Sequence, residues 1–181
     1  VPCPGPHGSQ SIEQALANSC NCVFGTLALE LGADTLGEYA DKLGLTSKHK
    51  LDNITTAAGK YDKDESGSAA LAWSGIGQYN DLVCPYAMLR YVCAIANGGT
   101  LNEPSMLGAS ENKTTLLSSS TASKIASMMN YNVTYKYGKS TFSGLDISGK
   151  TGTAEVGKGQ ASHGWFVGFL NDEEHPYAFV V

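Results

Sequence analysis

The sequence predicts an α+β protein, with helices in the first part of the chain and an antiparallel sheet in the last part. From about residue 10 to 130, apolar residues recur at the three- and four-residue intervals of helices that face a core. From about residue 140 to 181, apolar side chains instead alternate in the manner of strands. The chain has 181 residues, enough for one domain, and shows no internal repeat.

Each predicted helix has a recognisable beginning or end. Ser11-Ile-Glu-Gln14 has the pattern of a capping box, in which two side chains satisfy free N–H groups at a helix start. Thr35-Leu-Gly-Glu38 has the same pattern, and Pro85 suits the first turn of a later helix. A further short helix is predicted over Ala122 to Met129. Glycines that can end helices in a left-handed conformation are Gly32, Gly44, Gly98 and Gly99.

Three strands are predicted in the last forty residues. Asp146 to Val156 forms the first strand, and a glycine-rich turn follows it. The second strand runs from Trp165 to Leu170, and the third from Tyr177 to Val181. Because a short turn joins the first two strands, we expect them to pair in antiparallel orientation.

The composition argues against several classes of function. Hydrophobic residues make up 42% of the chain and charged residues 16%, which indicates a folded core rather than disorder. A net charge of −5 argues against nucleic-acid binding, which needs a basic surface. No apolar run approaches the ~20 residues that span a membrane, and Val1 begins no signal-peptide pattern. We therefore expect any anchor or targeting segment to lie outside this sequence.

The five cysteines do not show the spacing of a typical metal site. The sequence contains no Cys-x-x-Cys pair, from which many zinc sites are built. An odd number of cysteines also leaves at least one thiol unpaired. We therefore predict buried thiols, or one disulfide, rather than a metal site.

The segment Lys150-Thr151-Gly152-Thr153, inside the first predicted strand, is the strongest indication of chemistry. A lysine there offers a positive charge to a substrate carboxylate, and a threonine hydroxyl adds a hydrogen bond. A glycine within a strand weakens packing but lets a second backbone approach closely. This combination suits an edge strand that binds a peptide as an added strand. Taken alone, the segment also fits an exposed lysine beside a strand glycine, so its context decides.

The context is a set of sequence blocks between about residue 7 and residue 181. They are Gly149–Glu155 with His163–Phe169, Ser74–Gln78, Ala94–Gly99, and His7–Gly8 with Ala15–Asn21. In content and order these blocks resemble the transpeptidase domain of class B penicillin-binding proteins. Two departures, Tyr79 for the usual glycine and Cys84-Pro-Tyr for Thr-Pro-Leu, lie where the chemistry does not depend on them. The resemblance implies a β-lactamase/transpeptidase-like fold, with a helical lobe and an antiparallel sheet, truncated at both ends.

Ser19-Cys20-Asn21 matches the Ser-x-Asn motif of this family, in a turn between two predicted helices. The resemblance implies that Ser19 relays a proton and that Asn21 orients the substrate amide and the general-base lysine. Without the resemblance, a Ser19 or Asn21 that caps the second helix would explain the motif equally well.

The resemblance also assigns the strand residues. Lys150 joins Ser19 and Asn21 as a catalytic residue, and together with Thr151 it would hold the terminal carboxylate of the substrate. Gly152 belongs to the same substrate-binding strand, and the N–H of Thr153 would form half of the oxyanion hole.

The family's nucleophile is the serine of a Ser-x-x-Lys motif, which precedes Ser-x-Asn. No lysine precedes Ser19, so we predict that the nucleophile is absent from these residues and that the isolated chain is inactive. A rival assignment takes Ser47-Lys-His-Lys50 as the nucleophile motif, with Ser110-Glu-Asn112 and Lys150. A nucleophile should begin a buried helix, whereas the residues after Lys50 have no continuous apolar face, and Ser110 lies in a polar stretch.

The implied parent protein is a serine-type peptidoglycan D,D-transpeptidase that cross-links stem peptides through an acyl-enzyme and binds β-lactams. Its substrates would be stem peptides that end in D-Ala-D-Ala, and no metal or organic cofactor is implied. It would act at the extracytoplasmic face of the bacterial membrane, anchored there in a cell-wall synthesis complex, with no nucleic-acid partner. Two other classes remain open: a D-alanine carboxypeptidase or β-lactamase of the same fold, and a non-catalytic β-lactam sensor or pseudoenzyme.

Overall fold

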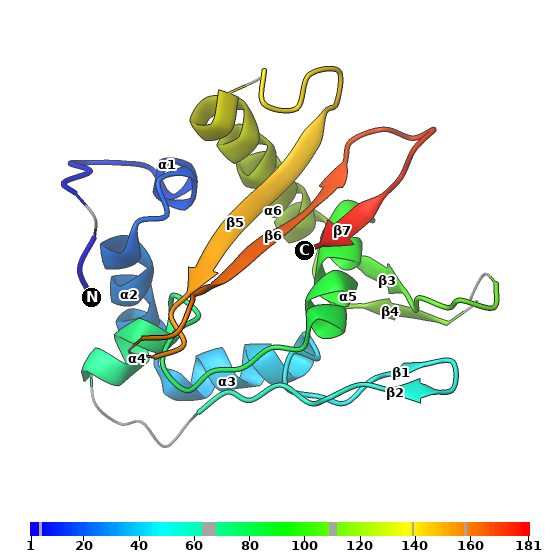
Figure 1. The fold of residues 1–181 in the computed structure, drawn as a ribbon, viewed down its shortest axis with the longest axis horizontal. Helices are drawn as coiled ribbons and strands as arrows, with labels where there is room; N and C mark the ends of the chain where they lie inside the picture. The colour runs from blue at the N-terminus through cyan, green and yellow to red at the C-terminus, as the bar shows by residue number, and fades with distance from the viewer. Residues whose placement is uncertain (4, 63–67, 109–111, 139, 158) are drawn as a thin grey trace.

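The computed structural model describes residues 1–181 except 4, 63–67, 109–111, 139 and 158 (Figure 1). Its helices are α1 (Ile12–Ala17), α2 (Asn21–Leu31), α3 (Ala33–Lys42), α4 (Ser68–Ser74), α5 (Pro85–Ala96) and α6 (Ser119–Tyr131), followed by the π-helix η1 (Asn132–Gly138). Its strands are β1 (Lys50–Leu51), β2 (Ile54–Thr55), β3 (Thr100–Asn102), β4 (Lys113–Thr115), β5 (Ile147–Ala154), β6 (His163–Leu170) and β7 (Ala178–Val180). The predicted α+β class is confirmed.

The two predicted capping boxes have different outcomes. At α1, the Ser11 hydroxyl accepts the N–H of Gln14 at 3.2 Å, and the Gln14 side chain accepts the N–H of Ser11 at 2.9 Å. The box predicted at Thr35 is wrong, because α3 begins at Ala33 and Thr35 lies inside it. Gly32 ends α2 with φ 81° and is also the residue that precedes α3, so no separate cap is needed.

Several short elements fall where the sequence predicts none. The polar stretch after α3 contains the β1–β2 hairpin, whose strands have two residues each, and β3 pairs with β4 over three residues each. Helix α4 and the π-helix η1 are also additional to the prediction. Strands this short show no measurable alternation, so their pairing is set by tertiary contacts rather than by a local pattern.

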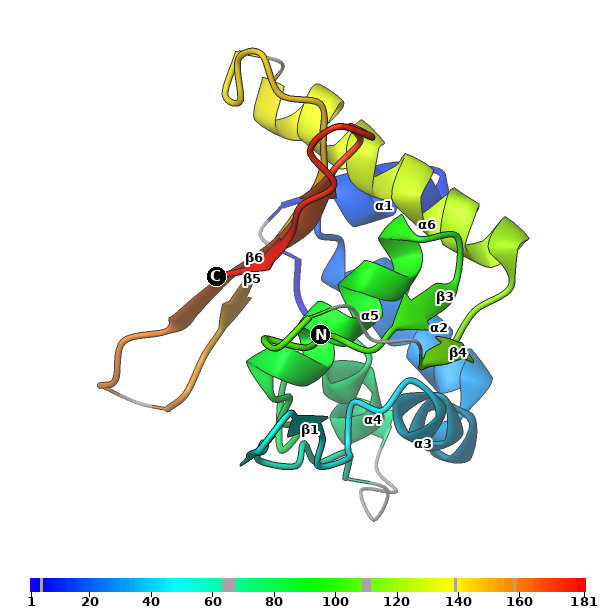
Figure 2. The ribbon, with the colours of Figure 1, turned by 90° about the vertical axis from the view of Figure 1, so that its right-hand side faces the viewer.

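The main sheet has the strand order β5-β6-β7, and both pairings are antiparallel, as predicted for β5 and β6. Lys150 lies opposite Val167, and Gly152 lies opposite Trp165. Helices α5 and α6 cover one face of the sheet, which Figure 2 shows nearly edge-on. The buried core between these layers contains Val92, Ile95, Met129 and Phe169. This packing leaves β5 at the edge of the described sheet.

No helix in the described part of the chain is both long enough and apolar enough to cross a membrane.

Candidate active site

One cavity of about 750 Å³ is lined by the residues that the sequence predicts to be catalytic or substrate-binding. It lies where the turn between α1 and α2 and the end of α4 face the edge strand β5. The predicted residues that line it are Ser19, Asn21, Lys150, Thr151, Gly152 and Thr153. Their convergence is therefore confirmed, although they come from opposite ends of the sequence; their individual roles stay predictions.

The closest contact across this cavity joins Lys150 to Ser19. The Lys150 ammonium donates to the Ser19 hydroxyl at 2.5 Å, across 131 positions of sequence, and to the Thr151 carbonyl at 2.7 Å. Burial lowers the pKa of Lys150, because a desolvated ammonium is costly, and a nearby tyrosine opposes this shift. Among the described residues, no carboxylate forms an ion pair with Lys150, so its charge is available to an anionic ligand.

The turn that carries Ser19 and Asn21 has an unusual backbone. Ser19 has φ 49°, in the left-handed region that non-glycine residues seldom occupy. Cys20 precedes α2 without a side-chain cap among the described residues, and Asn21 is the first helical residue. The alternative in which Ser19 or Asn21 caps α2 is therefore wrong. The side-chain amide of Asn21 instead donates to the carbonyl of Pro2 at 2.9 Å.

The free edge of β5 faces the cavity with its backbone polar groups. The carbonyl of Thr151 accepts from Lys150, and the carbonyl of Thr153 accepts from the Gln78 side chain at 3.0 Å. In a strand, the N–H and the carbonyl of one residue point to the same edge. The N–H of Thr153 therefore points away from β6 and toward the cavity, as an oxyanion-binding group must.

Gly152 lies between these two threonines and is exposed. A methyl group built on it would meet only the Cβ of Trp165, at 3.6 Å, which is an ordinary contact. The packing of this chain therefore does not require a glycine there. The absence of a side chain leaves room beside the edge strand for a second backbone.

Tyr137, in η1, is a site residue that the sequence reasoning missed. Its hydroxyl accepts the N–H of Thr151 at 2.9 Å and lies 2.8 Å from the Thr151 hydroxyl. Burial raises the pKa of Tyr137, but hydrogen bonds from Thr151 and Asn132, together with the positive charge of Lys150, outweigh it, so that the pKa is lowered overall. No periodic pattern surrounds Tyr137, so only the fold could reveal it.

The rival nucleophile assignment is not supported by the geometry. Ser47 is exposed in a bend and does not begin a helix, and Ser110 lies outside the described residues. Lys50 and Asn112 do line one cavity, of about 470 Å³, but Lys150 lines the other. The rival set is therefore split between two places.

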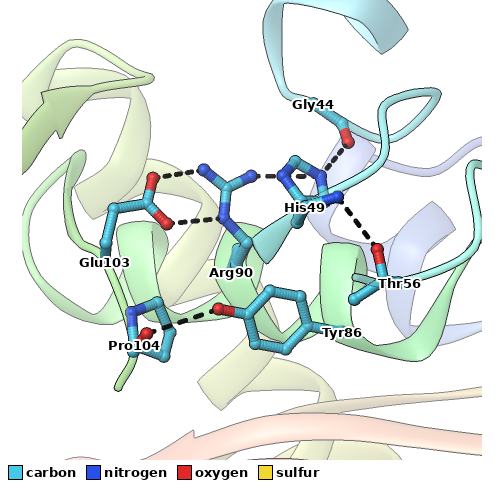
Figure 3. Close-up of polar contacts among 7 residues, drawn as sticks. All are labelled: Gly44, His49, Thr56, Tyr86, Arg90, Glu103 and Pro104. Carbon is cyan, nitrogen blue, oxygen red and sulfur yellow. Dashed lines mark hydrogen bonds and ion pairs between the residues drawn. The ribbon is translucent and has the colours of Figure 1, made fainter. Parts of the chain in front are cut away.

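The smaller cavity adjoins a dense polar cluster around Arg90, shown in Figure 3. The guanidinium forms two hydrogen bonds to the Glu103 carboxylate, one of them 3.0 Å long from Nε. Its Nη1 lies 3.2 Å from Nε2 of His49, which in turn lies 2.7 Å from the carbonyl of Gly44. These contacts connect α5 to the segments that precede β1 and follow β3.

Comparison with known proteins gives consistent results. The profile of the family described as penicillin binding protein transpeptidase domain matches residues 4–181. Peptidoglycan D,D-transpeptidase PbpA of Mycobacterium tuberculosis is 29% identical over 93% of this chain. The structure of penicillin-binding protein A from M. tuberculosis as an imipenem acyl-enzyme complex covers 98% of the chain, with 28% identity and a TM-score of 0.82. PBP2 of Helicobacter pylori, solved with MreC, shares the fold over 96% of the chain, with a TM-score of 0.82 at 23% identity.

These matches cover nearly all of this chain but less than half of each relative. The chain spans 37% of the curated PbpA sequence, 44% of the imipenem-bound protein and 36% of the H. pylori protein.

Proposed function

Because this chain belongs to the penicillin-binding protein transpeptidase family, we propose that it forms one side of a peptidoglycan D,D-transpeptidase active site. That side binds the substrate carboxylate and completes the oxyanion hole. The observation that carries the proposal is the contact between the Lys150 ammonium and the Ser19 hydroxyl, 2.5 Å long. A half-buried cation that faces neutral groups beside a free strand edge suits an anionic peptide end.

The substrate is a stem peptide that ends in D-Ala-D-Ala, bound along β5. Its terminal carboxylate receives hydrogen bonds from Lys150 and from the Thr151 hydroxyl. Its penultimate carbonyl lies against the N–H of Thr153, which stabilises the negative oxygen that forms during attack. A β-lactam presents a carboxylate and a strained amide to the same groups, so it occupies the same site.

The reaction is acyl transfer in two steps. A serine outside these 181 residues attacks the penultimate carbonyl, and the bond to the terminal D-alanine breaks. Ser19 relays a proton to the departing amine, so that D-alanine leaves neutral at nitrogen. An amine of a second stem peptide then attacks the ester, releases the serine and forms the cross-link. The nucleophile's general-base lysine also belongs to the part outside this chain.

Asn21 orients the substrate amide in this proposal. Its side-chain amide donates one hydrogen bond to the Pro2 carbonyl at 2.9 Å, which leaves its second N–H and its oxygen for a bound peptide. The parent protein acts at the outer face of the bacterial membrane, within a cell-wall synthesis complex.

Labelling with a fluorescent penicillin tests the proposal. We expect a covalent band on a denaturing gel for the longest form that the gene encodes, and no band for the 181-residue chain alone. Covalent capture needs an activated nucleophile, which residual binding groups cannot replace. A stoichiometric adduct on Ser47 or Ser110 of the short chain, located by peptide mapping, would overturn the assignment.

Product analysis separates the alternatives. With a D-Ala-D-Ala donor peptide and an amine acceptor, the longest form should release D-alanine and yield a cross-linked product detectable by mass. A product hydrolysed at the same bond, with no cross-link, would indicate a carboxypeptidase instead.

A further inference from the structure

Three metal-ligating side chains meet where the N-terminal segment runs alongside the start of α2 (Figure 1). They belong to Cys3, His7 and Cys20, and their ligand atoms all lie within 4.8 Å of one another. The two sulfurs are 3.5 Å apart. Cys20 is buried, and Cys3 and His7 are half-buried.

Two further features suggest that this cluster is built for a ligand. Nδ1 of His7 is buried without a hydrogen-bond partner in the described part of the chain. Buried polar atoms are almost always paired, so this nitrogen calls for an explanation. In addition, the backbone N–H of Cys22 donates to the sulfur of Cys3 at 3.3 Å, and such an outer hydrogen bond orients a ligand sulfur.

We propose that Cys3, His7 and Cys20 bind a zinc ion. Thiolate and imidazole are the ligands that Zn²⁺ prefers, with Zn–S distances of ~2.3 Å and Zn–N distances of ~2.0 Å. A sulfur separation of 3.5 Å suits two ligands of one such ion, and the imidazole ligand atom lies within 4.8 Å of both sulfurs. Binding releases both thiol protons to solvent, so that the two thiolates balance the charge of the ion. Water or another small ligand takes the fourth position.

A disulfide between Cys3 and Cys20 is the competing use of the same sulfurs. It would consume an oxidant and remove two protons and two electrons from the pair, and it would leave His7 without a partner. Zinc engages all three side chains, and with Nδ1 of His7 as the ligand atom it would also satisfy the buried nitrogen. The geometry therefore favours the metal.

The zinc site has a structural consequence for the neighbouring turn. Cys20 lies between Ser19, with its left-handed φ of 49°, and Asn21, whose side chain already contacts Pro2. An ion bound to Cys3, His7 and Cys20 ties the N-terminal segment to this turn at one point. It thereby holds a strained backbone in place beside the candidate active-site cavity, which Cys3 also lines.

The test is the metal content of the purified protein, in its longest encoded form, after dialysis. We expect about one zinc ion per chain, with two sulfur neighbours at ~2.3 Å in the X-ray absorption spectrum. Cys20→Ser and Cys3→Ser should each lower the zinc content at least ~tenfold. Cys22→Ser is the matched control and should keep the metal, because Cys22 contacts Cys3 through its backbone N–H while its thiol donates to the carbonyl of Val1.

Each alternative outcome contradicts the proposal. Wild-type protein that binds no zinc under reducing conditions would overturn it whether or not the variants fold. So would a spectrum with fewer than two sulfur neighbours, or a Cys20→Ser variant that keeps its zinc. A Cys3–Cys20 cross-linked peptide, found by mass after non-reducing digestion of metal-free protein, would assign the sulfurs to a disulfide instead.

Discussion

Lys150 is a half-buried cation and Arg90 a buried one, and their surroundings differ. The Arg90 side chain is 9% exposed, and its guanidinium meets the Glu103 carboxylate through two hydrogen bonds, with His49 on its other side (Figure 3). The Lys150 ammonium meets a serine hydroxyl and a backbone carbonyl, both electrically neutral. One charge is neutralised within the fold, and the other is not.

This difference separates a charge that supports the structure from one that serves a ligand. A buried cation with a paired carboxylate gains little from any further anion, because its partner already occupies it. A half-buried cation among neutral dipoles costs some stability until an anion arrives, and the arriving anion meets no competing carboxylate. The protein tolerates that cost at Lys150, beside a free strand edge, and avoids it at Arg90.

Replacing each cation in turn by methionine should give the largest effects of the changes considered. The two variants should lose different properties. In the longest encoded form, Lys150→Met should slow acylation by a labelled penicillin ~10²–10³-fold, because the carboxylate loses its cation. The free energy of unfolding should stay the same or rise slightly, since a desolvated charge is removed. Arg90→Met should instead lower the free energy of unfolding by about 3 kcal/mol, because the Glu103 carboxylate is left unpaired.

Gel fluorescence against time gives the acylation rate, and urea titration gives the stability. The double variant Arg90→Met with Glu103→Leu should recover part of the lost stability, because neither charge remains unpaired. Equal losses of stability in Lys150→Met and Arg90→Met would mean that both cations serve the structure alike.

Site residues that belong to short sequence motifs were predicted, whereas site residues outside such motifs were missed. Lys150-Thr-Gly152 and Ser19-Cys-Asn21 are short motifs, and the expectation that they converge came from the family resemblance that they carry together. Tyr137 was missed because it reaches Thr151 from a π-helix, and no pattern in the sequence announces one. The box predicted at Thr35 failed because Gly32 alone turns the chain from α2 into α3.

Contacts between residues far apart in the sequence were the other part of the structure that could not be predicted. Arg90 pairs with Glu103 across 13 positions and contacts His49 across 41, and neither spacing carries a signal. The cluster of Cys3, His7 and Cys20 lacks the close cysteine pair that predicts zinc, so it became visible only when the N-terminal segment was placed against α2. Such contacts are set by packing between elements rather than by local propensity.

Two glycines of the sheet, Gly168 and Gly152, differ in the space around them in the same way. A methyl group on Gly168 would lie 2.3 Å from the carbonyl oxygen of Ser148, so Gly168→Ala should cost about 1–3 kcal/mol of stability. Gly152→Ala meets only Trp165, at 3.6 Å, and should change the free energy of unfolding by less than ~0.5 kcal/mol. Its acylation rate should nevertheless fall about tenfold, because the methyl group intrudes on the bound peptide, at a cost near 1.4 kcal/mol. Urea titration of both variants, and labelling of Gly152→Ala, measure these effects. Normal labelling of Gly152→Ala would remove Gly152 from the substrate site.

The smallest expected effect concerns the pH dependence that Tyr137 gives to Lys150. Burial lowers the pKa of Lys150, and the neighbouring Tyr137 raises it, so Tyr137→Phe should lower that pKa further. Carboxylate binding requires the protonated ammonium, so acylation is supported below this pKa and lost as the pH rises through it. The alkaline fall of the acylation rate should therefore move to lower pH in the variant. At neutral pH the rate should drop only about fivefold, the worth of one hydrogen bond of ~1 kcal/mol to Thr151.

Tyr135→Phe is the matched control, because Tyr135 lies in the same π-helix, is exposed, and stacks on Tyr131 instead. A Tyr137→Phe profile that falls at the same pH as wild type, or at a higher one, would mean that Tyr137 holds the strand without influencing the charge.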